Sequence, residues 1–131
     1  MSQENVEIVR ALADAWNAGD MDTYGGFLAP DVIWRVTRNW PEPGPYVGRE
    51  AVLRQVRQLR EAWEGDTVEA VGDFLHTGDR VAVRFVWRGL GHGPDLNLEQ
   101  TCLYTVRVGK IMAFEFFWNH EEALKAMGVT E

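Results

Sequence analysis

Residues 97–118, NLEQTCLYTVRVGKIMAFEFFW, decide the fold of this 131-residue chain. They predict two long antiparallel strands joined by a tight turn at Val108, Gly109 and Lys110. Side chains alternate between the two faces of a strand, so the more apolar set of each half should face the core. These sets are Leu96, Leu98, Gln100, Cys102, Tyr104 and Val106 in the first half, and Met112, Phe114, Phe116 and Trp118 in the second. An inward face that combines aromatic rings with an amide, a thiol and a phenol indicates a pocket wall.

The composition limits what the chain can be. Its length fits one domain spanning residues 1–131. The net charge of −7 argues against a nucleic-acid partner, which would need a basic face. A single cysteine excludes an intrachain disulfide and a thiolate metal cluster. With neither a membrane-length apolar run nor a signal-peptide pattern, we expect a soluble cytoplasmic protein without a membrane partner.

The rest of the chain alternates between helix and strand patterns. Helices are expected from Ser2 to Gly19, after Asp20, after Gly48 and after Asn119, where Glu122 completes a capping box. Strands are expected at 31–37, 67–76 and 81–88, and the proline-rich segment 39–46 should be a stiff loop. Helices grouped early and strands grouped late predict an α+β domain, with a curved mixed or antiparallel sheet wrapped round the long third helix.

Six short motifs carry a resemblance across nearly the whole chain. They are AGD at 18–20, LAPDV at 28–32, GREAV at 48–52, GDRV at 78–81, VGKI at 108–111 and EEAL at 121–124. Their order and spacing resemble the SnoaL-like branch of the nuclear transport factor 2-like (NTF2-like) superfamily. The resemblance implies a cone-shaped α+β barrel with a deep pocket and a homodimer formed through the outer sheet face. Members include polyketide cyclases, steroid isomerases, epoxide hydrolases and dehydratases, so the fold does not determine the function.

The catalytic residues of these relatives are missing here. The tyrosine and the two aspartates of the steroid isomerases would fall near Leu12, near Val36 and at or next to Cys102. The epoxide hydrolases need inward aspartates, and here Arg84 and Arg88 have the outer parity with no such partner. The inward strand faces carry no Asp or Glu, although acid–base catalysis needs a positioned proton carrier. Whether the protein is an enzyme is left open; as an enzyme it would be an isomerase, cyclase or dehydratase without a metal.

The remaining proton carriers are few. They are His76, His120, Tyr24, Tyr104 and Cys102, with Glu115 added if a β-bulge turns its strand. We take His120, Tyr104 and Gln100 as candidate catalytic residues, although His120 also fits an exposed helix end and Cys102 a small buried apolar residue. Gln100 is included because a buried amide without partners costs about 1–3 kcal/mol, so it needs a structural or ligand partner.

Converging aromatic faces define the predicted ligand site. Buried indole N–H groups need acceptors, which a planar, oxygen-bearing apolar ligand would supply. Arg38 would meet a carboxylate at the mouth. The predicted ligand-binding residues are Trp16, Tyr24, Trp34, Arg38, Trp40, Leu59, Trp63, Phe85, Trp87, Cys102, Phe114, Phe116 and Trp118. Three histidines without ligand spacing predict no metal, and we expect no cofactor.

The outward strand faces are unusually apolar. Val86, Leu103, Ile111, Ala113 and Phe117 all have this parity, and a monomer rarely exposes such a patch, so a two-fold homodimer is expected. Three functions remain open. The chain is a SnoaL-like pocket protein of the cyclase or isomerase type, a non-catalytic carrier or sensor with the same pocket, or a protein-interaction module with a filled interior.

Overall fold

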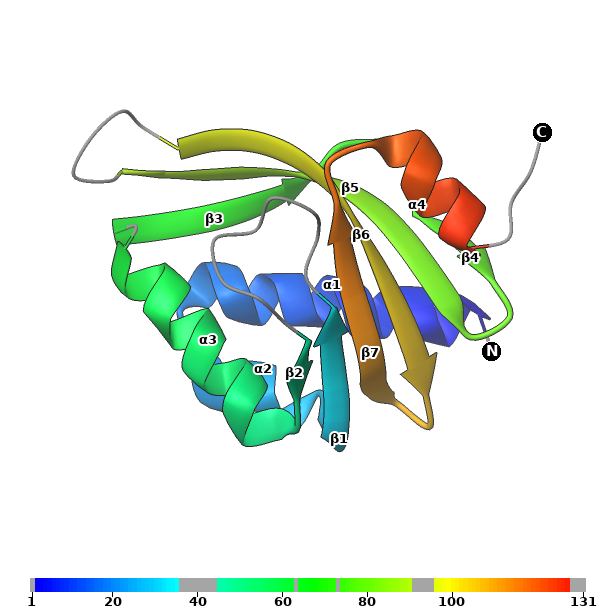
Figure 1. Cartoon of the computed structure of the whole chain (residues 1–131), viewed down its shortest axis with the longest axis horizontal. Helices are drawn as coiled ribbons and strands as arrows, with labels where there is room; N and C mark the ends of the chain where they lie inside the picture. Colours follow the sequence, from blue (N-terminus) through cyan, green and yellow to red (C-terminus); the bar gives the residue numbers. More distant parts are fainter. Residues whose placement is uncertain (1, 36–44, 63, 73, 91–95, 128–131) are drawn as a thin grey trace.

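The computed structural model describes residues 2–35, 45–62, 64–72, 74–90 and 96–127 (Figure 1). Its helices are α1 (Ser2–Ala18), α2 (Met21–Gly26), α3 (Arg49–Ala62) and α4 (His120–Met127). Its strands are β1 (Leu28–Arg35), β2 (Tyr46–Val47), β3 (Glu64–Ala70), β4 (Leu75–Thr77), β5 (Arg80–Leu90), β6 (Leu96–Arg107) and β7 (Lys110–Phe117). The predicted α+β class is confirmed.

The strands form one curved sheet that does not close on itself. Along it the strands follow the order β2-β1-β7-β6-β5-β3, and β4 adds to β5. All neighbours are antiparallel except β1 and β7, which run parallel. The sheet is therefore mixed, with its long central strands supplied by the stretch from which the fold was predicted.

The β6–β7 hairpin confirms the predicted strands and adds one bulge. Val108 and Gly109 form its turn, both with positive φ (51° and 72°). The register passes from Thr105 opposite Ala113 to Val106 opposite Ile111, so Met112 is the extra residue. Ile111 is therefore fully buried in the core, and its predicted outward orientation was wrong.

Two helices lie against the inner face of the sheet. The apolar stripe of α1 is buried at Val6, Val9 and Leu12, and α3 is buried at Val52 and Val56. α1 contacts β3, β4, β5 and β6, whereas α3 contacts β1, β2 and β3. The sheet thus curves round both helices, and α1 crosses it behind the central strands in the view of Figure 1.

Two predicted strand boundaries were wrong. Segment 67–76 is divided between β3 and β4. Gly72, which lies between them, has a φ of 86°, and this left-handed conformation interrupts the extended backbone. The first strand begins at Leu28, three residues earlier than expected, and it includes Pro30. Proline is tolerated there because the register of β1 against β7 is irregular between Leu28 and Ile33, so its missing N–H interrupts no regular ladder.

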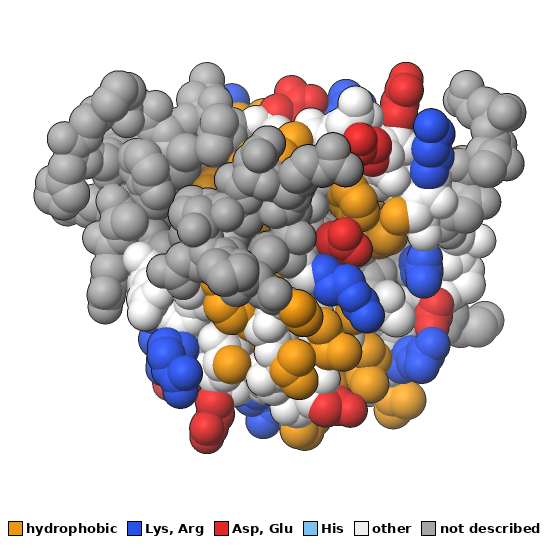
Figure 2. All heavy atoms as spheres, in the orientation of Figure 1, with side chains coloured by type: hydrophobic (Ala, Val, Ile, Leu, Met, Phe, Trp, Pro, Cys, Tyr) orange, Lys and Arg blue, Asp and Glu red, His pale blue; other side chains and the backbone are white. Residues whose placement is uncertain are grey.

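The outer face of the sheet is partly covered. α4 contacts β5, β6 and β7, and beneath it Ala82 and Leu103 form a small buried cluster with Leu75 and Phe117. Leu103 and Phe117 were expected on an open face, so α4 accounts for part of that apolar surface. Figure 2 shows further apolar side chains over β1, β7 and the β6–β7 turn, with charged groups among them. The homodimer stays a prediction.

Candidate functional site

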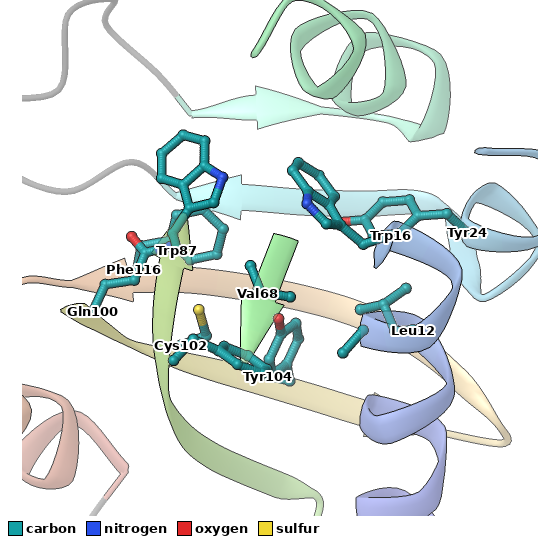
Figure 3. Close-up of a pocket in the computed structure, with 11 residues that line it drawn as sticks. Leu12, Trp16, Tyr24, Val68, Trp87, Gln100, Cys102, Tyr104 and Phe116 are labelled. Atoms are coloured by element: carbon teal, nitrogen blue, oxygen red, sulfur yellow. The ribbon is translucent and has the colours of Figure 1, made fainter. Parts of the chain in front are cut away.

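A small cavity lies between the helices α1 and α2 and the inner face of the sheet (Figure 3). About 40 Å³ of it is open to the centres of water molecules, which is room for a few waters. Ala13, Val68 and Phe116 in its wall are partly exposed, so the cavity reaches the surface beside them. The wall comes from six elements: α1, α2, β3, β5, β6 and β7.

The sheet supplies most of the wall through simple alternation. β6 contributes Gln100, Cys102 and Tyr104, three residues of one parity, each at most 6% exposed. β5 places Phe85 directly opposite Gln100, and β7 places Phe116 opposite Cys102. Trp87 of β5 lines the same cavity. The inward orientation predicted for Gln100, Cys102 and Tyr104 is confirmed.

The helices supply the facing wall. Leu12, Ala13 and Trp16 come from α1, and Tyr24 comes from α2. The Trp16 and Tyr24 rings lie 5.6 Å apart at an angle of 59°. The position of Tyr24 is set by the N-cap of α2, where the Asp20 carboxylate accepts hydrogen bonds from the Thr23 backbone N–H (3.1 Å) and hydroxyl (2.6 Å).

The cavity wall is uncharged throughout its described residues. Burial raises the pKa of Tyr104 well above that of free tyrosine, and the neighbouring Cys102 thiol and Tyr24 add to the shift. Burial likewise raises the pKa of Cys102, against the effect of its hydrogen bond with Tyr104. Both groups are therefore neutral at pH 7. They can form hydrogen bonds, but neither is a thiolate or phenolate that would act as a base.

Gln100 has an unusual environment for an amide. Its side chain is 4% exposed, and its Oε1 has no hydrogen-bond partner within the described part of the chain. Figure 3 places this side chain at the end of the cavity that Trp87 and Phe116 also line. A buried acceptor in this situation costs about 1–3 kcal/mol unless water or a ligand donates to it.

Several predicted ligand-binding residues lie behind the cavity wall. Trp34 and Phe114 are buried, and their rings stack 5.4 Å apart at 17°. Phe114 stacks in turn on Tyr104, at 5.9 Å, and Trp34 meets Phe116 edge-on, at 5.4 Å. These two residues therefore buttress the wall without forming it.

Two further predictions need correction. Trp118 is 41% exposed, because β7 ends at Phe117 and strand alternation does not extend past it. His120 lies on the other side of the sheet, where its Nδ1 is 2.9 Å from the hydroxyl of Thr101. Thr101 has the parity opposite to Gln100 and Cys102. His120 therefore does not reach the cavity, contrary to the prediction.

Two other proton carriers also lie away from the cavity. His76 is exposed, and Glu115 lies on the outer face beside Arg35 and Arg80, since the bulge at Met112 precedes it.

Some predicted residues cannot be placed. Arg38, Trp40 and Trp63 lie outside the described residues, as does the side chain of Leu59. Three wall residues were absent from the predicted site, namely Leu12, Ala13 and Val68. The apolar stripe of α1 and the alternation of β3 contain the signal for them, but neither pattern tells a cavity wall from a packed core.

Among the described residues, no group of three or more His, Cys, Asp or Glu side chains has an arrangement suited to a metal ion. No helix within the same residues is both long and apolar enough to cross a membrane.

Comparison with known proteins identifies the family. Residues 9–114 match the model of the SnoaL-like domain, and the chain belongs to this family. No curated protein sequence matches the chain.

The fold recurs in many solved structures. A protein of unknown function with a cystatin-like fold from Xanthomonas campestris is 26% identical, with a TM-score of 0.78 over 91% of this chain and 95% of that one. A candidate SnoaL-like polyketide cyclase from Jannaschia Sp. CCS1 is 20% identical, with a TM-score of 0.77 over 99% and 94%. TerC, co-crystallized with polyporic acid, is 20% identical, with a TM-score of 0.77 over 95% and 97%. At such identities the last two show the shared NTF2-like fold alone.

Proposed function

We propose that this protein binds a small, apolar, oxygen-bearing molecule in the cavity between α1, α2 and the sheet. The observation that carries the proposal is the buried acceptor of Gln100 in an otherwise aromatic and aliphatic wall. Ligand sites in proteins are typically apolar clefts of about 300–1,000 Å³ with a few placed polar groups. This cavity has that composition, but only about 40 Å³ of it is open to the centres of water molecules, so a ligand larger than a few waters has to move wall side chains as it enters. The SnoaL-like family and the TerC structure with polyporic acid support a ligand of this kind.

The residues that line the cavity favour ligand binding over catalysis. The described wall has no carboxylate or imidazole, and burial keeps the Tyr104 hydroxyl protonated. A neutral tyrosine can still hydrogen-bond to a carbonyl oxygen and stabilise charge that develops there. An isomerase or cyclase activity that uses Tyr104 in this way is the second candidate, because the family includes candidate polyketide cyclases. The proposal retains a cytoplasmic location and a homodimer as predictions.

The third reading from the sequence, an interaction module, predicts a filled interior. The cavity counts against it, because a packed core seldom leaves an unpaired amide acceptor beside open space.

Native mass spectrometry of freshly purified protein, combined with tryptophan fluorescence, tests the proposal. We expect a bound small molecule that denaturation releases, and quenching of Trp16 and Trp87 when the emptied protein is titrated with neutral aromatic compounds. Ala13→Leu should weaken this binding, because Ala13 lines the cavity and a leucine there would occupy part of it. Ala13 is partly exposed, so the larger side chain should not prevent folding. The exposed α1 position Asp14→Ala is the matched control. A protein that carries no ligand and shows no quenching with any compound would overturn the proposal.

Turnover separates the two candidates. If the released molecule is converted to a product by wild-type protein, and Tyr104→Phe lowers kcat while leaving the dissociation constant within about threefold, the catalytic candidate is supported. Binding without conversion supports a carrier or sensor.

A further inference from the structure

We infer that the ligand of this cavity is electrically neutral and carries a hydroxyl or N–H group that donates a hydrogen bond to Oε1 of Gln100. This inference rests on the proposed function and specifies the ligand's chemistry. It selects phenols and related neutral aromatic alcohols over ethers, ketones and ionised acids of the same size.

The need for a donor follows from the one unpaired acceptor. Oε1 of Gln100 is enclosed and lacks a partner in the described chain, whereas the Tyr104 hydroxyl and the Cys102 sulfur are already hydrogen-bonded to each other. Trp16, Tyr24 and Trp87 each have interactions of their own. A water molecule can satisfy Oε1 in the free protein, and a ligand that displaces this water must replace its hydrogen bond. An ether or ketone oxygen has no proton to give and would leave the acceptor unpaired.

The need for neutrality follows from the rest of the wall. None of the described lining residues carries a charge, and the lining is mostly aromatic and aliphatic. A carboxylate brought into such a site loses its hydration without gaining a counter-ion, which is strongly unfavourable. A phenol is neutral at pH 7, since its pKa is close to that of tyrosine.

The position of Gln100 makes it a specificity residue and not a structural one. Within the sheet it faces Phe85 across the β5–β6 pair, and the Phe85 ring has no N–H or O–H to donate to Oε1. The backbone of Gln100 pairs with β5 whatever its side chain is. An apolar residue at this position would therefore allow the same strand pairing without burying an unpaired acceptor. The amide is therefore retained at a cost to folding, which a ligand donor offsets.

Three compounds with the same ring test the inference: 4-methylphenol, 4-methylanisole and 4-methylbenzoate. Each is titrated into the wild-type protein at pH 7, with binding followed by calorimetry and by the fluorescence of the cavity tryptophans. We expect 4-methylphenol to bind about tenfold or more tightly than the methyl ether, as the loss of one buried hydrogen bond implies. The carboxylate should bind more weakly than either.

Variants then assign the preference to Gln100. Gln100→Leu should reduce the ratio between the phenol and the ether to about one, and Gln100→Met should do the same with a longer side chain if the leucine variant folds poorly. Gln55→Leu is the matched control, because Gln55 is another buried glutamine, on α3, that is not among the cavity-lining residues. It should leave the ratio at its wild-type value.

The outcomes are distinct. Equal binding of phenol and ether by the wild-type protein, or a preference that survives in both Gln100 variants, would overturn the inference while leaving the binding cavity in place. Tightest binding of 4-methylbenzoate would also overturn it and would favour the sequence prediction that Arg38 meets a carboxylate. Failure of all three compounds to bind would remove both the inference and the proposed function for a ligand of this size.

Discussion

The side-chain amide of Asn17 forms two hydrogen bonds with the backbone of Val68, from Nδ2 to the carbonyl oxygen (2.9 Å) and from the Val68 N–H to Oδ1 (2.8 Å). β3 stands at one end of the strand order, so these atoms lie on an edge strand. The last turn of α1 thereby takes the place of a neighbouring strand. Because the Val68 side chain lines the cavity, this pair also fixes the cavity wall at the point where α1 meets the sheet.

Asn17→Ala should lower the free energy of unfolding by about 1–2 kcal/mol, since it removes two hydrogen bonds at a partly solvated site. Hydrogen exchange at the Val68 amide should accelerate more than exchange in the centre of β6. Chemical denaturation and exchange measured by NMR check both effects. Asp14→Ala, at an exposed position on the same helix, should change stability by less than about 0.5 kcal/mol. Unchanged exchange at Val68 would contradict the role given to Asn17.

The turn between β6 and β7 contains a locally unfavourable residue. Val108 has a φ of 51° and is 99% exposed, so its branched side chain adopts a left-handed conformation without any packing in return. Val108→Asn should raise the free energy of unfolding by about 1 kcal/mol, because asparagine tolerates this conformation and suits two-residue hairpins. Thermal and chemical denaturation measure the change.

Gly109→Ala provides the opposite test at the next position. Gly109 has a φ of 72° with open space around it, so an added methyl group meets no atom and only the backbone strain remains. This variant should lose about 1 kcal/mol. A destabilised Val108→Asn protein would show that the valine has a role in the turn other than the one its geometry indicates.

Local patterns predicted the parts of the site that depend on a single element. Gln100, Cys102 and Tyr104 share one face because alternation is a property of the strand itself. Leu12 and Trp16 lie on the apolar stripe of α1 for the same reason, and the Asp20 cap follows from its side chain alone.

Relationships between elements were not predictable in this way. The bulge at Met112 turned Ile111 inward, and it depends on how β7 pairs with both β1 and β6. The sequence of α4 is amphipathic but does not say which surface it covers. As a result His120 was expected in the cavity, whereas it lies over Thr101 on the outer face. Trp34 and Phe114 had the correct orientation, but alternation cannot separate a wall residue from the layer behind it.

Cys102 should be unreactive in the folded protein. It is 2% exposed, and burial raises the pKa of its thiol, so the nucleophilic thiolate is scarce at pH 8. A disulfide reagent such as 5,5′-dithiobis(2-nitrobenzoate) should label it only as fast as the chain opens, with full labelling in denaturant. Ala13→Leu should leave this slow rate unchanged unless it destabilises the fold. Rapid labelling of native protein would show that the cavity admits a bulky charged reagent, against the narrow, uncharged cavity described above.

His120 should couple the packing of α4 to pH. Burial and the neighbouring Arg84 lower its pKa below the usual 6.5, while Glu99 and Glu121 oppose the shift. The unfolded chain therefore binds this proton more readily than the folded one between the two pKa values. The stabilising contribution is complete above about pH 6.5 and decreases as the pH falls toward the folded-state value.

Titration of the His120 ring by NMR should give a pKa below the usual 6.5 of histidine. The difference in unfolding free energy between wild type and His120→Gln should change between pH 7.5 and pH 5, with wild type losing relative stability as the pH falls. Comparison of the two proteins cancels the contribution of Glu115, whose pKa burial raises and which acts in the opposite direction. Thr101→Val keeps the shape but removes the 2.9 Å partner of Nδ1, so it should destabilise the protein at pH 7.5. A His120 pKa at or above 6.5 would mean that α4 does not hold the ring against the sheet as described.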